Sequence, residues 1–150
     1  MVKKIQSKTA KSVAAILEQE LDSMIREWNR QVGLVPRLTS ILLSDADRTD
    51  HLPTLFDGVL CRLRGNRATE PPVSIAAGAH GRLRFAQGYS VAMLVEESRL
   101  LEVTTFGALQ RHAGDLDRNQ VLPDVVIIAD EVDRQLEETV AGFMVAQAAA

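Results

Sequence analysis

Apolar residues recur at intervals of three and four over a long first stretch of the chain, from about Lys11 to Gln31. This is the period of a helix with one buried face. Gly33 and Pro36 follow the stretch, and both residues are typical of a helix end. We therefore predict a first long helix with a core tryptophan, whose buried stripe consists of Val13, Ile16, Leu17, Leu21, Met24, Ile25, Trp28 and Val32.

The same period returns in later stretches and predicts four further main helices. They run from Pro53 to Leu63, from Pro71 to about Gln87, from Ser90 to His112, and from near Pro123 past Phe143. The short apolar stretch Leu38–Leu43 predicts one or two additional helical turns.

The acidic segment from Asp45 to His51 has some features of a calcium-binding loop. Such a loop needs glycine at its sixth position and a glutamate further on, and Asp50 occupies the glycine position. We therefore expect these acids to act in turns and as helix caps.

The segment Leu122–Asp130 has a second interpretation, because its sequence also fits a buried parallel strand that ends in an acid. A parallel sheet needs several such strands alternating with helices. We find no second one, so the helix is favoured. The predicted fold is all-α: one domain, a bundle of about five main helices over residues 1–150, with residues 1–10 as a tail. Residues 148–150 look like an added boundary sequence, beyond which the natural chain would continue.

Composition indicates the class of the protein and its cellular compartment. Hydrophobic residues make up 46% of the chain and charged residues 25%, an ordinary balance for a globular domain. The single cysteine, Cys61, excludes an internal disulfide. No signal peptide and no apolar stretch of membrane-spanning length is visible. We expect a cytoplasmic protein without membrane contact, and the net charge of -3 argues against nucleic-acid binding.

Charge is unevenly distributed along the chain. Residues 115–138 carry eight acids against two arginines, whereas the middle of the chain is basic through Arg62, Arg64, Arg67, Arg82 and Arg84. We favour two separate solvated faces, although these regions could also meet within the fold or across a dimer.

Motifs that would indicate catalysis or a bound cofactor are missing from the sequence. Gly78-Ala-His-Gly81 lacks the lysine and the spacing of a phosphate-binding loop. Zinc sites draw on clustered cysteine and histidine ligands, whereas His51, His80 and His112 are far apart in the sequence. We therefore expect no metal, no cofactor and no enzymatic activity of the domain itself.

Polar residues nevertheless gather around one predicted helix junction. His80, Arg84 and Gln87 lie along the edge of an apolar stripe, and Glu97 falls close in angle to apolar positions of the next helix. Gly88 permits a sharp reversal between the two helices. Glu97 could then accept hydrogen bonds from His80 or Arg84 and hold the helices in register.

The segment His80–Leu101 resembles the N-terminal domain of RsbRD-type stressosome co-antagonists, and similar domains precede histidine kinase modules. Ser98 departs from the family pattern, which has tyrosine there. The weaker pattern of flanking helices covers roughly residues 12–145. The residues that match the family pattern are His80, Arg84, Gln87, Gly88, Tyr89, Ser90, Glu97, Arg99, Leu100 and Leu101.

The resemblance implies an all-helical input domain, of a kind that can be related in architecture to globins that have lost haem. It would sense a small molecule or a partner, relay the signal through its last helix to a kinase or stressosome output, and form a homodimer. We expect the ligand or switch site at His80, Arg84, Gln87, Tyr89, Glu97 and Arg99.

Three alternatives remain open at this stage. The main one is a histidine phosphotransfer bundle with His80 as the phosphoacceptor. Acid–base catalysis by His80 and Glu97 is a second, and haem ligation by His80 is a third. The residues after His80 fit a phosphotransfer motif poorly, so the input domain is the leading hypothesis.

Overall fold

The structure, a computed structural model, describes residues 9–65 and 70–150, the side chains of residues 70–74 excepted. Tail residues 1–8 and the basic Arg67 therefore lie outside the described residues. Within these ranges the fold is all-α and contains no strand. The helices are α1 (Val13–Val32), α2 (Pro36–Thr39), α3 (Asp45–Thr49), α4 (Leu52–Leu63), α5 (Glu70–Ala86), α6 (Val91–Arg111) and α7 (Arg118–Ala149), with one 3-10 turn, η2 (Ala113–Asp115).

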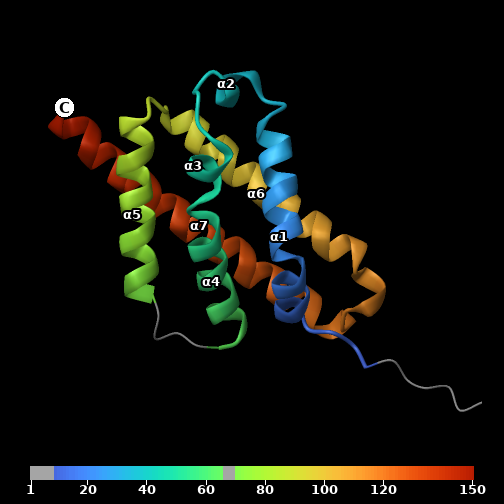
Figure 1. Cartoon of the computed structure of the whole chain (residues 1–150). Coiled ribbons are helices and arrows are strands. Elements are labelled where there is room, and N and C mark those ends of the chain that lie inside the picture. Colours follow the sequence, from blue (N-terminus) through green and yellow to red (C-terminus); the bar gives the residue numbers. More distant parts are fainter. Residues whose placement is uncertain (1–8, 66–69) are drawn as a thin grey trace, which may run out of the picture.

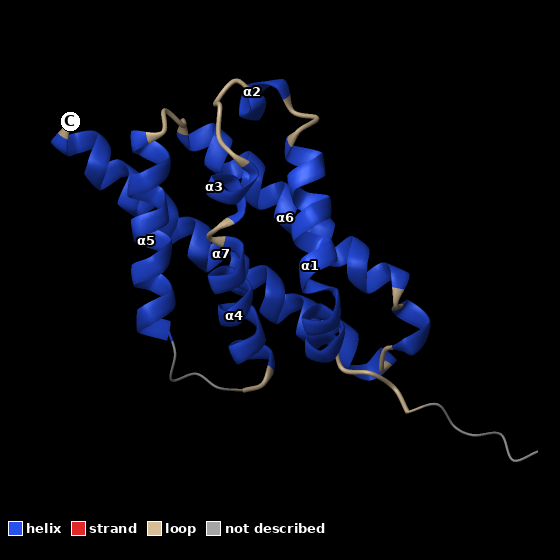
Figure 2. Ribbon diagram, viewed as in Figure 1, coloured by secondary structure: helices blue, strands red, loops and turns tan. Residues whose placement is uncertain are grey.

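The helices form two layers (Figures 1 and 2). Helices α1, α4 and α5 lie side by side in one layer. The long helices α6 and α7 cross behind them, and α7 runs diagonally across the whole bundle to the C-terminal end (Figure 1). Helix α7 thereby contacts α4, α5 and α6. None of the described helices is long and apolar enough to span a lipid bilayer.

Local sequence explains where most of the helices begin. Ser12 caps α1 by accepting a hydrogen bond from the backbone N–H of Ala15, and Ser44 caps α3 by accepting one from Asp47. Pro53 lies in the first turn of α4, where its missing N–H costs little. The acidic segment 45–49 forms a short helix of its own after the Ser44 cap, so its acids lie in a first turn.

The predicted start of the last helix near Pro123 is wrong. Helix α7 begins at Arg118, because Asp117 caps it by accepting a hydrogen bond from the N–H of Asn119. Pro123 therefore lies inside the helix, where it removes one backbone hydrogen bond. The strand interpretation of Leu122–Asp130 is excluded, because the whole segment is helical.

The core lies between the two layers and is built mainly from aliphatic side chains. Trp28 is 1% exposed, which confirms its prediction as a core residue. It packs in one cluster with Phe56 of α4, Leu101 of α6 and Ile128 of α7. The predicted stripe of α1 thus faces this interior. On α5, by contrast, Ile75 and Leu83 are 71% and 43% exposed, so the buried face of that helix is not a simple apolar stripe.

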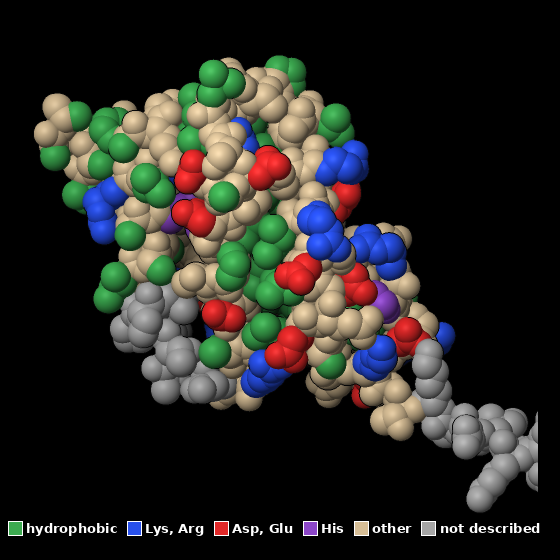
Figure 3. All heavy atoms as spheres, viewed as in Figure 1, with side chains coloured by type: hydrophobic (Ala, Val, Ile, Leu, Met, Phe, Trp, Pro, Cys, Tyr) green, Lys and Arg blue, Asp and Glu red, His purple; other side chains and the backbone are tan. Residues whose placement is uncertain are grey.

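The acidic and basic stretches meet where α4 packs against α7. Arg62 Nη1 donates hydrogen bonds to Asp130 Oδ2 at 2.6 Å and to Glu131 Oε2 at 3.2 Å. On the face that Figure 3 shows, acidic and basic side chains are interspersed. The favoured picture of two separate charged faces therefore does not hold at the contact between α4 and α7.

Helices α5 and α7 approach each other closely because glycines line their contact. A Cβ atom added at Gly81 would overlap the carbonyl oxygen of Thr139, and one added at Gly142 would overlap the carbonyl oxygen of Gly78. The two backbones touch at this crossing, so neither helix can move far without displacing the other.

Substitution of Gly81 by alanine should destabilise the fold strongly. Its Cβ would overlap backbone atoms of α7, which cannot move aside as a flexible side chain can. We expect a loss of about 3 kcal/mol or more in the free energy of unfolding, measured by urea denaturation. The matched control is Gly107→Ala in α6, where the nearest atom to an added Cβ is Arg111 Nη1 at 3.8 Å. An equal loss in both variants would contradict the tight-contact interpretation.

Candidate functional site

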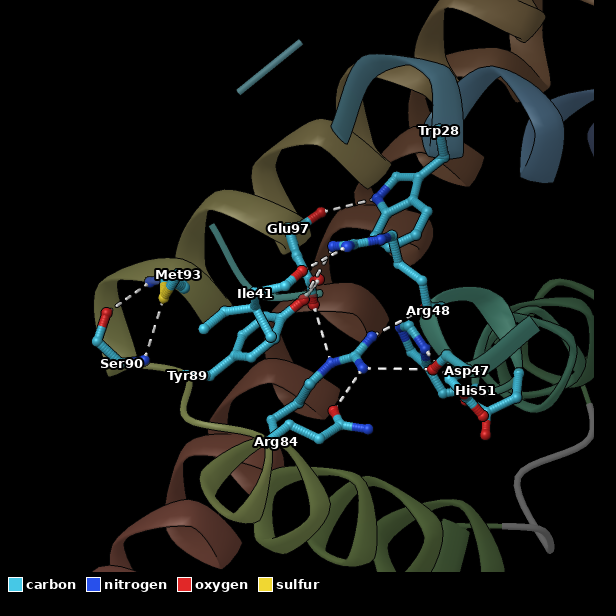
Figure 4. Close-up of polar contacts among 12 residues, drawn as sticks. Trp28, Ile41, Asp47, Arg48, His51, Arg84, Tyr89, Ser90, Met93 and Glu97 are labelled. Carbon is cyan, nitrogen blue, oxygen red and sulfur yellow. Dashed lines mark hydrogen bonds and ion pairs between the residues drawn. The ribbon is translucent and has the colours of Figure 1, made fainter. Parts of the chain in front are cut away.

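The reversal between α5 and α6 places polar side chains of both helices opposite each other. Gly88 adopts a φ of 89°, which glycine tolerates best, and the chain turns sharply there. The Ser90 hydroxyl then accepts a hydrogen bond from the N–H of Met93 at 3.3 Å and caps α6. Glu97 consequently faces Arg84 across the junction, as Figure 4 shows.

Glu97 is the centre of a buried polar cluster. Glu97 is only 4% exposed to solvent. Oε1 accepts a hydrogen bond from the Tyr89 hydroxyl at 2.6 Å, and Oε2 lies 3.4 Å from Arg84 Nε. Its backbone carbonyl accepts a hydrogen bond from Trp28 Nε1 at 3.0 Å, which ties α6 to α1. Burial raises the pKa of the Glu97 carboxyl, and the charge of Arg84 opposes this shift.

Arg84 is fully buried, with 0% exposure, and is held mainly by neutral oxygen atoms. Nη2 donates to the carbonyl of Arg48 at 2.8 Å, and Nη1 donates to Gln87 Oε1 at 2.8 Å. The guanidinium carbon also lies 4.8 Å from the centre of the Tyr89 ring. These contacts fix Arg84 independently of Glu97.

Arg48 of α3 completes the cluster from a third direction. Nη1 donates to the Tyr89 hydroxyl at 3.3 Å, and Nη2 donates to the carbonyl of Ile41 at 3.0 Å. Tyr89 therefore accepts from Arg48 and donates to Glu97. The raised pKa of the Tyr89 hydroxyl, caused by burial and by the Glu97 charge, keeps it a donor.

Two histidines stack beside this cluster. The rings of His51 and His80 lie 3.8 Å apart at an angle of 14°, and Trp28 meets His51 edge-on with ring centres 5.8 Å apart. Burial lowers the pKa of His80 to about 3, and the charge of Arg84 adds to the effect. Burial also lowers the pKa of His51 well below its usual value. Both rings are therefore neutral at physiological pH.

Small cavities flank the stacked rings. A cavity of about 40 Å³ borders His51, His80 and Glu97, and a second of about 90 Å³ borders the two histidines. Gln135 and Thr139 of α7 line both. Neither cavity has room for a haem, so the structure gives the haem alternative no support.

The structure brings five of the six predicted site residues together: His80, Arg84, Gln87, Tyr89 and Glu97. The sixth, Arg99, is exposed and donates to Glu96 Oε1 at 3.0 Å. Sequence reasoning missed Trp28, Arg48 and His51, which come from distant parts of the chain and are described above.

The same geometry bears on the alternatives that involve His80. The ring is half-buried and stacked on His51, whereas a phosphoacceptor histidine must reach the active site of a partner protein. Glu97 is already engaged by Tyr89 and Arg84. The arrangement therefore favours neither phosphotransfer nor acid–base catalysis.

Substitution of Glu97 by glutamine should leave the Arg84 charge buried without its counter-ion. We expect a loss of about 3 kcal/mol in the free energy of unfolding, measured by urea denaturation. The matched control is the neighbouring Glu96→Gln, whose ion pairs with Arg37 and Arg99 lie at the surface. The control should change stability little. Equal losses of unfolding free energy in the two variants would show that the buried pair of Glu97 and Arg84 stabilises the fold no more than the surface pairs of Glu96.

Acidification should weaken the fold through the two histidines. Below about pH 6.5 the unfolded chain binds protons that folded His51 and His80 exclude, so the free energy of unfolding falls as the pH falls. Each histidine contributes at most about 1.4 kcal/mol per pH unit. Urea denaturation at several pH values would measure the slope, and His80→Gln should make it shallower. An unchanged slope in that variant would contradict the assignment.

Comparison with known proteins gives one match, which covers most of the chain. No curated protein and no solved structure matches the chain. Residues 13–150 match the family model described as the RsbT co-antagonist protein rsbRD N-terminal domain. The match includes every described helix. The chain therefore belongs to the family of rsbRD N-terminal domains, the domain family of stressosome-type regulatory proteins.

Proposed function

We propose that this domain is the non-catalytic, cytoplasmic input module of a bacterial signalling protein. In this proposal the buried cluster around Glu97 and the stacked histidines forms the sensing site, which responds to a small molecule or a partner. Helix α7 relays the response to an output domain. The output is a stressosome-type regulator acting on an RsbT-like partner, or a histidine kinase.

One observation carries the proposal: α7 lines both cavities and is also the last helix of the described residues. Gln135 and Thr139 border both cavities, and α7 continues without a break to Ala149. A ligand in either cavity would press directly on α7. Rigid helices pass such displacements along their length as small shifts or rotations.

Besides the cavity lining, the contact of Gly81 with α7 is a second connection between the cluster and that helix. Gly81 directly follows His80 and touches the backbone of α7 at Thr139. A shift of α5 that follows a change at His80 or Arg84 is therefore opposed by α7 unless that helix moves too. The cavity lining and the glycine contact therefore both connect the cluster to the C-terminal half of α7.

Self-association forms part of the proposal and is supported by the surface of α7. Four large apolar side chains lie exposed along it, Leu122 at 73%, Val126 at 66%, Met144 at 57% and Val145 at 64%. Exposed apolar side chains along one helix are typical of a surface that meets another chain. In a homodimer, the second subunit would provide a surface against which α7 moves.

Hydrogen exchange tests the relay. In Glu97→Gln, amides of α7 from Gln135 onward should exchange at least five times faster than in the unmodified chain. Amides of α1 from Ala14 to Met24 share the core but lie apart from the cavities, and they should change less. Mass spectrometry of peptides from both helices provides the measurement.

Glu96→Gln serves as the control and should leave exchange in both helices unchanged. Acceleration by the same factor in α1 and α7 would mean that Glu97→Gln only lowers global stability. That result would overturn the relay.

A further inference from the structure

Three side chains that could bind a metal ion converge on the small cavity beside the buried cluster. His51, His80 and Glu97 each offer one ligand atom, and these atoms lie within 4.8 Å of one another. We propose that these three residues form a binding site for a divalent transition-metal ion of the zinc type. The site was not expected from the sequence, in which the histidines are far apart.

The ligand atoms are available for this role. Nδ1 of His51 is buried and has no hydrogen-bond partner in the described part of the chain, and Asp50 Oδ1 lies 3.9 Å from it. Oε2 of Glu97 lies 3.4 Å from Arg84 Nε, and that nitrogen likewise forms no hydrogen bond with described residues. Oε2 can therefore turn toward a metal while Oε1 keeps its hydrogen bond from Tyr89.

The cavity has a suitable size and lining for an ion. Its volume of about 40 Å³ holds a metal ion with a water molecule, and excludes most metabolites. None of the described residues that line it is lysine or arginine. Ser98, Gln135 and Thr139 add side-chain oxygens that could hold a water molecule in an open coordination position.

The guanidinium of Arg84 lies outside the cavity lining and is also held by neutral oxygen atoms. Its two terminal nitrogens donate to the carbonyls of Asp47 and Arg48 and to the Gln87 side chain. Arg84 would therefore stay in place when Glu97 Oε2 turns away from it. Its nearby charge still opposes a cation, so the site should bind more weakly than a structural zinc site.

Coordination requires the stacked rings to rearrange. Zinc binds imidazole nitrogen and carboxylate oxygen at about 2.0–2.2 Å, so neighbouring ligand atoms lie about 3.3 Å apart. Because an imidazole lone pair lies in the ring plane and the two rings are nearly parallel, at 14°, one ring must tilt out of the stack so that both nitrogens point at the same ion. Two nitrogens and one carboxylate suit zinc, cobalt or iron, whereas calcium and magnesium favour all-oxygen sites.

A bound ion would also act on the signalling elements. It would draw Glu97 of α6 toward His80 of α5, at the side of the cavity that Gln135 and Thr139 of α7 complete. The ion would then be the input of the relay. This step rests on the proposed function, whereas the binding site itself rests on geometry alone.

Calorimetric titration of the purified 150-residue chain with Zn²⁺ tests the site. We expect one ion per chain, and at least tenfold weaker binding in His80→Gln. The matched control is His112→Asn, because His112 is also half-buried and pairs with Glu20 Oε1 at 3.0 Å, away from the cavity. The control should bind like the unmodified chain.

A spectroscopic measurement on the unmodified chain keeps the test independent of how the variants fold. Co²⁺ should give visible absorption typical of four or five ligands, and Zn²⁺ should shift the ring resonances of His51 and His80 but not those of His112. The proposal is overturned if no binding occurs at millimolar metal, or if only the His112 resonances respond. If Zn²⁺ binds but hydrogen exchange in α7 stays unchanged, the binding site is supported and its role in the relay is overturned.

Discussion

The architecture around the site depends on one buried carboxylate. Glu97 contacts Arg84 of α5 and Tyr89 at the helix junction, and its own carbonyl accepts from Trp28 of α1. Removing a carboxylate from water is unfavourable unless charge and hydrogen bonds compensate it. Three separate segments must therefore be in place together for the cluster to form. This requirement makes the cluster sensitive to any group that competes for Glu97.

The contact between α5 and α7 determines which helix would respond to a change in the cluster. Most helix pairs are separated by side chains that can adjust, but at Gly81 and Gly142 backbone meets backbone. Changes on the α5 side of the cluster are consequently not absorbed by rotamer changes at this crossing. They act on a 32-residue helix that extends to Ala149. The α5 side of the cluster is thus linked to α7 by direct backbone contact.

The sequence predicted the long helices well where one periodic stripe is buried, as in α1, and less well the buried face of α5, on which Ile75 and Leu83 are exposed. It indicated that His80, Arg84, Gln87, Tyr89 and Glu97 lie close together, because a single helix junction joins the segments that carry them, and their role as a site stays a prediction. It misplaced the start of α7, because proline is typical of a first helical turn, whereas Pro123 lies inside this helix and Asp117 caps it earlier. Trp28, Arg48 and His51 belong to other helices, and no local pattern reports a contact across 41 or 69 residues. The ring stack between His51 and His80 is likewise a product of tertiary packing.

Trp28 gives the domain a built-in optical reporter. It is the only tryptophan of the chain, its indole N–H is bound to the Glu97 carbonyl, and its ring meets His51 edge-on. The emission of an indole depends on its hydrogen bonding and on quenching groups nearby. Fluorescence from the intact chain therefore originates within the site, and its colour and intensity follow events there without any attached dye.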